Sequence, residues 1–234
     1  MKPEPLSRQL IGNAEVLLWD LDLAGEVESV ATDILPVAEV KTAVRAPDPV
    51  VRRRRLAGRV LLRTAIAERM GARPEELVFE LGPHGKPHVV RGPSFNLSHS
   101  ERFLALAIRP SGRVGIDLEV IRHSPDLAAV ARRHFTDSEQ RAIATSRDGP
   151  TQAFFRVWVR KEALLKAVGS GLALPLDSFS VSAEELHPAA NALAQLGPAS
   201  ELSGEWLVTS LAAPPTTMLA IAMDRPKRDG FGRS

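Results

Sequence analysis

Two short strips of the sequence carry acidic and basic side chains at spacings that suit a divalent metal ion and a phosphate. The first strip reads GIDLE and ends at Glu119, and the second reads WVRKEALLK and ends at Lys166. Together they supply the carboxylates of Asp117, Glu119 and Glu162 and the ammonium of Lys166. Carboxylate ligands without histidine or cysteine favour magnesium over zinc, with manganese as an alternative.

Asp117 and Glu119 are expected on one face of a β-strand. From Arg113 to Val120, apolar residues alternate with glycine, aspartate and glutamate, as a half-buried strand requires. Two carboxylates about 7 Å apart along a strand repel each other unless a cation or water lies between them. These residues alone leave a second interpretation open, an exposed strand face with ordinary charges.

Glu162 and Lys166 are expected on one face of a helix, because Trp158, Glu162 and Lys166 follow one another at intervals of four. In isolation, a Glu–Lys pair at this spacing is typical of a surface ion pair worth a few tenths of a kcal/mol. In the context of the first strip, Glu162 instead completes a three-carboxylate magnesium site. Lys166, one turn further on, then meets a phosphate that the metal also holds.

Four arginines recur every three or four residues on a long helix expected from Asp48 to Met70. They are Arg52, Arg55, Arg59 and Arg63. Such rows are usually solvated faces or ion-pair partners, and a ligand with several phosphates would also use them. Nucleic acid is disfavoured as a partner, because few aromatic residues interleave with the row and the formal net charge is only +2.

Ser98 and His99 lie at the end of an expected strand within the sequence FNLSHS. A Ser–His pair suggests a hydrolase, but adjacent residues of an extended segment point to opposite faces, and no G-x-S-x-G elbow is present. Backbone amides and His99 as phosphate donors are the more economical interpretation. Lys86, in the turn sequence Gly85-Lys86-Pro87, says little by itself.

The composition favours a soluble cytoplasmic protein. With 234 residues and 44% apolar content, the chain can form one domain or two small ones. The absence of cysteine excludes disulfides and thiolate chemistry and fits a reducing compartment. No signal peptide or membrane-spanning run is evident, so no membrane association is expected.

Each half of the chain is expected to give a strand, a long helix and further strands. The strands are expected at 14–22, 77–80, 86–90, 94–98, 103–109, 114–120, 178–182, 206–211 and 218–223, and the long helices at 48–70 and 154–168. A shorter helix is expected to start at the capping box Thr136-Asp137-Ser138-Glu139.

This layout predicts an α/β (α+β) fold of two similar lobes related by pseudo-twofold symmetry. Each lobe has a long helix packed on a small, mainly antiparallel sheet, and the active site is expected in the cleft between them. The expected N-terminal lobe covers residues 1–110 and the C-terminal lobe residues 111–224. A basic tail at 225–234 is expected to be disordered.

The strips, taken together, resemble those of the 4′-phosphopantetheinyl transferases of the larger, single-chain, surfactin-synthetase-activator type. The matching strips are Gly85-Lys86-Pro87, Phe95 to Ser100, Gly115 to Glu119, Phe155 through Trp158, Lys161-Glu162-Ala163, and Lys166 to Gly171-Leu172. Each strip is weak alone, but they occur in the family's order and roughly its spacing. The resemblance covers well over half of the chain.

The resemblance implies transfer of the phosphopantetheine arm of coenzyme A to a serine of an acyl or peptidyl carrier protein, leaving 3′,5′-ADP. Breaking a diphosphate needs charge neutralisation and a base for the attacking hydroxyl. Asp117, Glu119 and Glu162 are assigned to magnesium, with Glu162 or a metal-held water as the base. Lys166 is assigned to the diphosphate, where it stabilises charge as ADP departs.

By analogy with the family, basic and hydroxyl side chains of the first lobe hold the phosphates of coenzyme A. These are Lys86 with its neighbours Gly85 and Pro87, Ser98, His99, and the arginine row. Arg52, Arg55 and Arg59 are equal candidates for the 3′-phosphate. Lys161 is expected at the rim of the site, where it also touches phosphate.

The carrier protein is expected to dock beside the metal, between Ile121 and Phe135. Carrier proteins are acidic helical bundles, so Arg132 and Arg133 in this segment would give charge complementarity. The enzyme is expected to act as a monomer. The sequence does not distinguish carriers of fatty-acid, polyketide or nonribosomal peptide synthesis.

Two other functions are compatible with parts of the sequence. A metal-dependent nuclease with an Asp and a Glu-x-Lys on adjoining strands is disfavoured, because Glu119 is followed by Val120 and Ile121. A non-catalytic coenzyme A or nucleotide-binding module is disfavoured too, because three carboxylates would hinder binding of a polyanion without a metal.

Overall fold

The computed structural model describes residues 4–25, 27–169, 174–185, 191–195 and 202–225. The chain is mixed α/β and divides into two compact units, residues 1–111 and 112–234. This division adjoins the lobe boundary expected after residue 110. Of the expected basic tail, only Arg225 falls within the described residues. Across the described ranges, no helix has the length and apolar character needed to cross a membrane.

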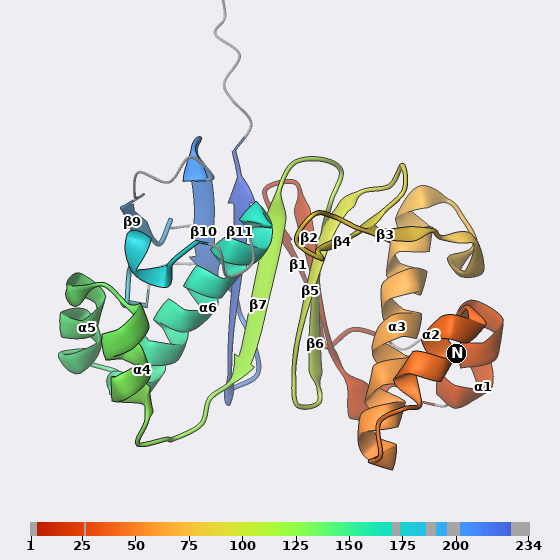
Figure 1. Cartoon of the computed structure of the whole chain (residues 1–234), viewed down its shortest axis with the longest axis horizontal. Coiled ribbons are helices and arrows are strands. Elements are labelled where there is room, and N and C mark those ends of the chain that lie inside the picture. The colour runs from red at the N-terminus through yellow and green to blue at the C-terminus, as the bar shows by residue number, and fades with distance from the viewer. Residues whose placement is uncertain (1–3, 26, 170–173, 186–190, 196–201, 226–234) are drawn as a thin grey trace, which may run out of the picture. The chain divides into compact units, whose positions relative to one another are not determined.

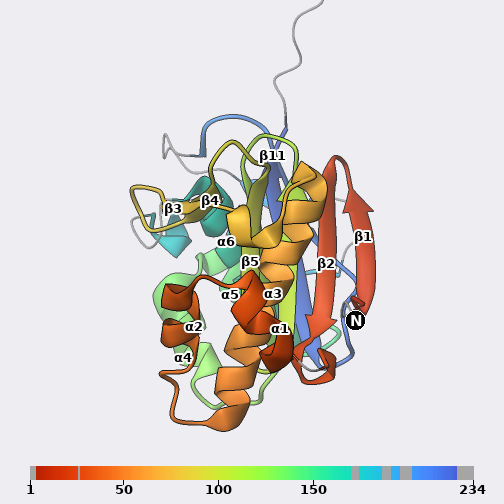
Figure 2. The ribbon, with the colours of Figure 1, turned by 90° about the vertical axis from the view of Figure 1, so that its right-hand side faces the viewer.

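The first unit is built on a four-stranded antiparallel sheet with the strand order β1-β2-β6-β5. Its strands are β1 (Ser7–Ile11), β2 (Ala14–Asp20), β5 (Ser94–Ser100) and β6 (Phe103–Arg109). Its helices are α1 (Val27–Ile34), α2 (Val37–Ala43) and α3 (Pro49–Met70), with a short 3-10 turn, η1 (Leu21–Leu23), after β2. All three α-helices lie on one side of the sheet (Figures 1 and 2).

Helix α3 begins and ends where the sequence predicts. The Asp48 side chain accepts a hydrogen bond from the Val50 amide at 2.7 Å, and Pro49 occupies the first turn. Gly71 ends the helix in the left-handed conformation, with φ of 61°. Apolar side chains of α3 such as Ala57 and Ile66 form the core of the unit with those of β2 and β6.

A hairpin follows α3 and carries the Gly85-Lys86-Pro87 turn. Its elements are η2 (Pro74–Glu76), β3 (Phe79–Leu81) and β4 (Pro87–Val89). The Gly82 amide donates to the Lys86 carbonyl at 2.9 Å, and Gly85 has φ of 78°, which favours glycine. The expected turn at Lys86 is confirmed.

The second unit contains a three-stranded antiparallel sheet with the order β10-β11-β7. The strands are β7 (Val114–Val120), β10 (Trp206–Ser210) and β11 (Thr217–Asp224). The helices are α4 (Leu127–His134), α5 (Asp137–Ala144) and α6 (Pro150–Val168). Helix α6 packs across all three strands (Figure 1). The remaining described elements are η4 (Leu176–Ser178), β8 (Ser180–Val181) and β9 (Leu193–Gln195).

Each unit therefore contains a long helix packed on an antiparallel sheet, as predicted. The capping box at Thr136 is present, because the Thr136 hydroxyl and the Glu139 carboxylate each accept from the other residue's amide. The pseudo-twofold relation and the cleft between the lobes stay predictions.

Candidate active site

Helix α6 lies very close to strand β7 because the strand has a glycine at the point of contact. A Cβ atom built on Gly115 would lie 2.1 Å from the Ala163 carbonyl oxygen and 2.3 Å from the Ala167 amide nitrogen. No other residue type fits there without moving the helix. The glycine therefore lets the backbones meet, and Lys166 of α6 reaches Asp117, the next residue on the same face of β7.

Lys166 and Asp117 form an ion pair at the centre of the candidate site. The Lys166 ammonium donates to Asp117 Oδ1 at 2.6 Å. Asp117 is only 3% exposed, whereas 30% of the Lys166 side chain is exposed. The site thus has a buried carboxylate at its base and an ammonium that reaches solvent.

The expectation of a half-buried strand is wrong for β7. The strand is buried on both faces from Val114 to Leu118, and only its last residues are partly exposed. The reason is that α6 covers the face that carries Gly115 and Asp117. Glu119, nearer the end of the strand, is half-buried.

Glu162 lies within electrostatic reach of the other two carboxylates. Burial raises its pKa above the usual value, and the negative charges of Asp117 and Glu119 raise it further, while Lys166 acts in the opposite direction. The structure therefore places Lys166 against Asp117, and both Asp117 and Glu119 lie near enough to Glu162 to act on its pKa.

The chemistry of the three carboxylates, Asp117, Glu119 and Glu162, suits a magnesium ion. Carboxylate oxygens are the ligands that Mg²⁺ prefers. Burial is the main cause of the raised pKa of Glu162, and an ion would relieve the carboxylate repulsion that adds to it. Among the described residues, however, no group of three or more His, Cys, Asp or Glu side chains is already arranged around one point. Lys166 instead bonds one oxygen of Asp117. Magnesium binding by these carboxylates is therefore a proposal.

Replacing Glu162 with glutamine should raise thermal stability at neutral pH. Because folding raises the pKa of Glu162, its ionised form is less favourable in the folded than in the unfolded chain. This cost is present above the folded-state pKa and is lost as the pH falls below the unfolded-state value. We expect Glu162→Gln to melt a few degrees above the wild type at about pH 8, with the difference shrinking toward about pH 4.

Calorimetric melting curves without metal or coenzyme A check this expectation. A lower melting temperature for the variant at the higher pH would show that the Glu162 carboxylate stabilises the fold, contrary to the direction of its pKa.

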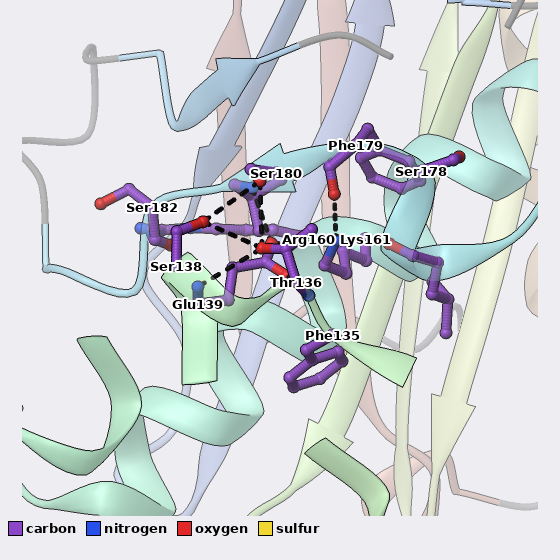
Figure 3. A network of polar contacts seen from close by, with 12 residues as sticks. Phe135, Thr136, Ser138, Glu139, Arg160, Lys161, Ser178, Phe179, Ser180 and Ser182 are labelled. Atoms are coloured by element: carbon purple, nitrogen blue, oxygen red, sulfur yellow. Dashed lines mark hydrogen bonds and ion pairs between the residues drawn. The ribbon is translucent and has the colours of Figure 1, made fainter. Parts of the chain in front are cut away.

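The expectation that Lys161 faces the rim is wrong. Its side chain is fully buried, with 0% exposure. The ammonium forms an ion pair with Glu139 at 2.9 Å and donates to the backbone carbonyls of Leu176, at 2.6 Å, and Phe179 (Figure 3). These three acceptors use all three donors of the ammonium, so Lys161 has no free donor for a phosphate in this conformation.

The arginine row on α3 divides into two kinds of side chain. Arg63 is buried, pairs with Glu39 and donates to the carbonyls of Pro74 and Leu77, so it supports the fold and does not belong to a surface stripe. Arg55 is exposed, and Arg52 and Arg59 are half-buried.

Arg52 already makes local contacts. Its guanidinium donates to the carbonyls of Ala46 and Pro47 just before the helix, at 3.0 and 2.8 Å. The three candidates for the 3′-phosphate are therefore no longer equal, because Arg52 must give up or share these bonds to bind a ligand.

Ser98 and His99 point to opposite faces of β5, as predicted. Ser98 is buried at 7% exposure and His99 is exposed. A phosphate at His99 would therefore not meet the Ser98 hydroxyl from the same side. Lys86 is half-buried on the hairpin turn. These residues belong to the first unit, and their joint role in binding stays a prediction.

Two residues of the second unit have functions that the sequence interpretation did not assign. Gly115 sets the approach of α6, and the available signal was a glycine inside a strand pattern. Glu139 was identified as a capping residue, but its pairing with Lys161 was not. A lysine on the buried side of an apolar helix requires such a partner.

Comparison with known proteins places the chain in a family. The model of the 4′-phosphopantetheinyl transferase superfamily matches residues 113–211, and that of the 4′-phosphopantetheinyl transferase N-terminal region matches residues 29–111. The two matches meet where the chain divides into its two units.

Individual relatives agree. The 4′-phosphopantetheinyl transferase HetI from Nostoc sp. is 35% identical over 196 residues, 80% of this chain and 81% of the relative. The transferase Sfp from Bacillus subtilis is 37% identical over 131 residues, 55% and 57% of the two chains. The transferase AcpT from Salmonella typhi is 36% identical over 148 residues, 62% and 72% of the two chains.

The chain therefore belongs to the 4′-phosphopantetheinyl transferase superfamily. The match to Sfp, together with both family regions in one chain, confirms the larger single-chain type expected from the sequence.

Proposed function

We propose that this protein transfers the 4′-phosphopantetheine arm of coenzyme A to a serine of an acyl or peptidyl carrier protein. The serine oxygen forms a bond to the β-phosphorus of coenzyme A, the diphosphate P–O bond breaks, and 3′,5′-ADP leaves with the bond electrons. Family membership supports this reaction. The observation that carries it is the cluster of Asp117, Glu162 and Lys166 on β7 and α6.

Asp117, Glu119 and Glu162 would hold a magnesium ion, or manganese in its place. When bound, the ion would neutralise charge on the diphosphate. Lys166 is exposed enough to move from Asp117 to a phosphate oxygen and to stabilise the negative charge of the departing ADP. Glu162 is our candidate base, because its raised pKa makes it a better acceptor of the serine proton.

Residues of the first unit would bind the phosphates of coenzyme A. The proposed contacts are Lys86 with its turn, His99, the backbone around Ser98, and Arg55 or Arg59. Arg52 is a weaker candidate for the 3′-phosphate than the other two arginines, because its guanidinium already makes local hydrogen bonds. We further propose a monomer located in the cytoplasm, and the absence of cysteine fits a reducing compartment.

A single incubation tests the function. The protein is mixed with coenzyme A, magnesium and an unmodified carrier protein, and the carrier is weighed by mass spectrometry. We expect a mass increase equal to one phosphopantetheine group and equimolar release of 3′,5′-ADP. Coenzyme A bound but not consumed would instead indicate a binding module.

Charge reversal on α4 tests the carrier-binding surface. Arg132 and Arg133 are exposed in the last turn of α4, in the segment that follows the end of β7. Replacing both with glutamate should raise the KM for an acidic carrier by about tenfold or more and leave the KM for coenzyme A unchanged.

The matched control is Arg147→Glu, which changes another exposed arginine of the same unit, beyond the end of α5. An unchanged KM for the carrier in the Arg132→Glu/Arg133→Glu protein would show that the carrier binds to another surface.

A further inference from the structure

We infer that the buried ion pair between Glu139 and Lys161 is a positioning device for the active site. The pair fixes helix α6 in the rotation at which Lys166 contacts Asp117 and Glu162 stands beside it on the same face of the helix. The inference rests on the proposed function of those three residues. It assigns to Lys161 a role in geometry and not in binding of phosphate.

Lys161 is held from three directions by groups of three different elements. Its ammonium meets the Glu139 carboxylate of α5, the Leu176 carbonyl of η4 and the Phe179 carbonyl before β8 (Figure 3). It also lies 4.2 Å from the centre of the Phe179 ring and 5.9 Å from that of Phe135. The end of the side chain therefore cannot move without breaking several contacts at once.

Glu139, the other member of the ion pair, also connects several elements. Its Oε1 atom accepts from the Val181 amide of β8 at 2.8 Å as well as contacting Lys161. Its Oε2 atom accepts from the Thr136 amide at 2.9 Å and so caps α5. At 2% exposure, this carboxylate connects the start of α5, strand β8 and helix α6.

Leu176 and Phe179 belong to the segment of residues 174–185, which we call the strap. Two arginines of α6 bind the later part of this strap. Arg156 donates to the Ala183 carbonyl at 2.6 Å. Arg160 donates to the carbonyls of Ser182 and Glu184 at 2.6 and 2.9 Å. Three cations of one helix thus bind backbone oxygens of the strap, but only Lys161 has a carboxylate partner that is itself fully enclosed.

The position of Lys161 determines the position of its neighbour, Glu162. Successive residues are about 100° apart around a helix, so a rotation of α6 that moves Lys161 away from the strap also displaces Glu162 and Lys166 relative to Asp117. On the opposite side, Gly115 leaves no space for α6 to approach β7 further. Gly115 therefore sets how closely α6 approaches β7, and the ion pair sets the rotation of α6 about its own axis.

A stabilising role alone does not explain such a pair. Removing two charges from water costs about as much as their attraction returns, and apolar replacements of similar volume are often as stable. What the pair adds is a defined geometry, because an ammonium and a carboxylate accept only a few arrangements of their hydrogen bonds.

The test compares the double variant Lys161→Met/Glu139→Gln with the wild type. The variant removes both charges and nearly keeps both side-chain lengths. Methionine cannot donate to the Leu176 and Phe179 carbonyls, and glutamine has one oxygen for the two amides that Glu139 serves, so we expect a lower melting temperature in a protein that still folds. We expect kcat to fall about 10- to 100-fold with an unchanged KM for coenzyme A, because α6 is no longer fixed in rotation. Calorimetric titration with magnesium in the presence of coenzyme A should show weaker binding by a similar factor.

A matched control is Arg156→Met, which removes another buried cation from α6 that binds the same strap but lies six residues before Glu162. It should lower the melting temperature without the loss of kcat. If the double variant does not fold, Glu139→Asp replaces it, because it keeps both charges but shortens the carboxylate side chain, and a smaller loss of kcat is then expected. Wild-type kcat and magnesium affinity in a folded variant would overturn the inference, whereas an inactive wild type would overturn the proposed function instead.

Discussion

Glu162→Gln should reduce carrier modification by about 10³-fold or more while the protein remains folded. The substitution keeps the shape of the side chain but removes the charge that would bind the metal and accept the serine proton. Its raised pKa shows that the carboxylate sits in an environment that disfavours its charge. Proteins retain such a group at a cost in stability where function requires it.

Mass spectrometry of the carrier after timed incubation measures the loss. Glu184→Gln makes the same chemical change at an exposed position of the second unit and should retain full activity. Wild-type rates in Glu162→Gln would remove this residue from the site and leave the family membership intact. Asp117→Ala should give a comparable loss, because it removes the buried carboxylate that Lys166 contacts.

Gly115→Ala should damage both the stability and the activity of the protein. The added methyl group would lie 2.1 Å from the Ala163 carbonyl, so α6 must move away from β7. Overpacking of this kind costs about 1–3 kcal/mol, which corresponds to about 2–4 °C of melting temperature per kcal/mol in a protein of this size. A displacement of about 1 Å between Glu162 and Asp117 is expected to reduce kcat about 100-fold.

Gly58→Ala provides the comparison for this effect. Gly58 lies within α3, and a Cβ atom there would meet its nearest neighbour, Leu104 Cδ2, at 3.9 Å. We expect this variant to be as stable as the wild type or more so, since alanine favours the helix by about 1 kcal/mol. Equal stability of Gly115→Ala and Gly58→Ala would contradict the tight approach of α6 to β7.

Local sequence signals predicted the elements that carry the candidate site. Strands β6 and β7 have the predicted bounds, because apolar residues and alternation extend over their whole length. Asp48 and Gly71 marked the ends of α3, and the capping box marked the start of α5. The family pattern placed the two strips in one site, but it assigned Lys166 to a phosphate and did not predict its contact with Asp117.

Tertiary packing accounts for the features that the sequence did not predict. Alternation in β7 indicated one exposed face, but α6 covers that face. Lys161 looked like a rim residue, because a lysine is rarely fully buried and its partner Glu139 lies on another helix. Strand β1 and helices α1 and α2 were not predicted, since short elements are recognised mainly by what they pack against.

The way in which α6 holds the strap determines which mutations can accumulate there over evolutionary time. Arg156, Arg160 and Lys161 bind main-chain oxygens, which every amino acid has. Exchanges at exposed positions such as Asp177 and Glu184 therefore leave the cations with the same acceptors. Loss or gain of a single codon in the strap would instead displace the whole row of carbonyls along the helix. Insertions and deletions in the strap should therefore be much rarer among related sequences than substitutions.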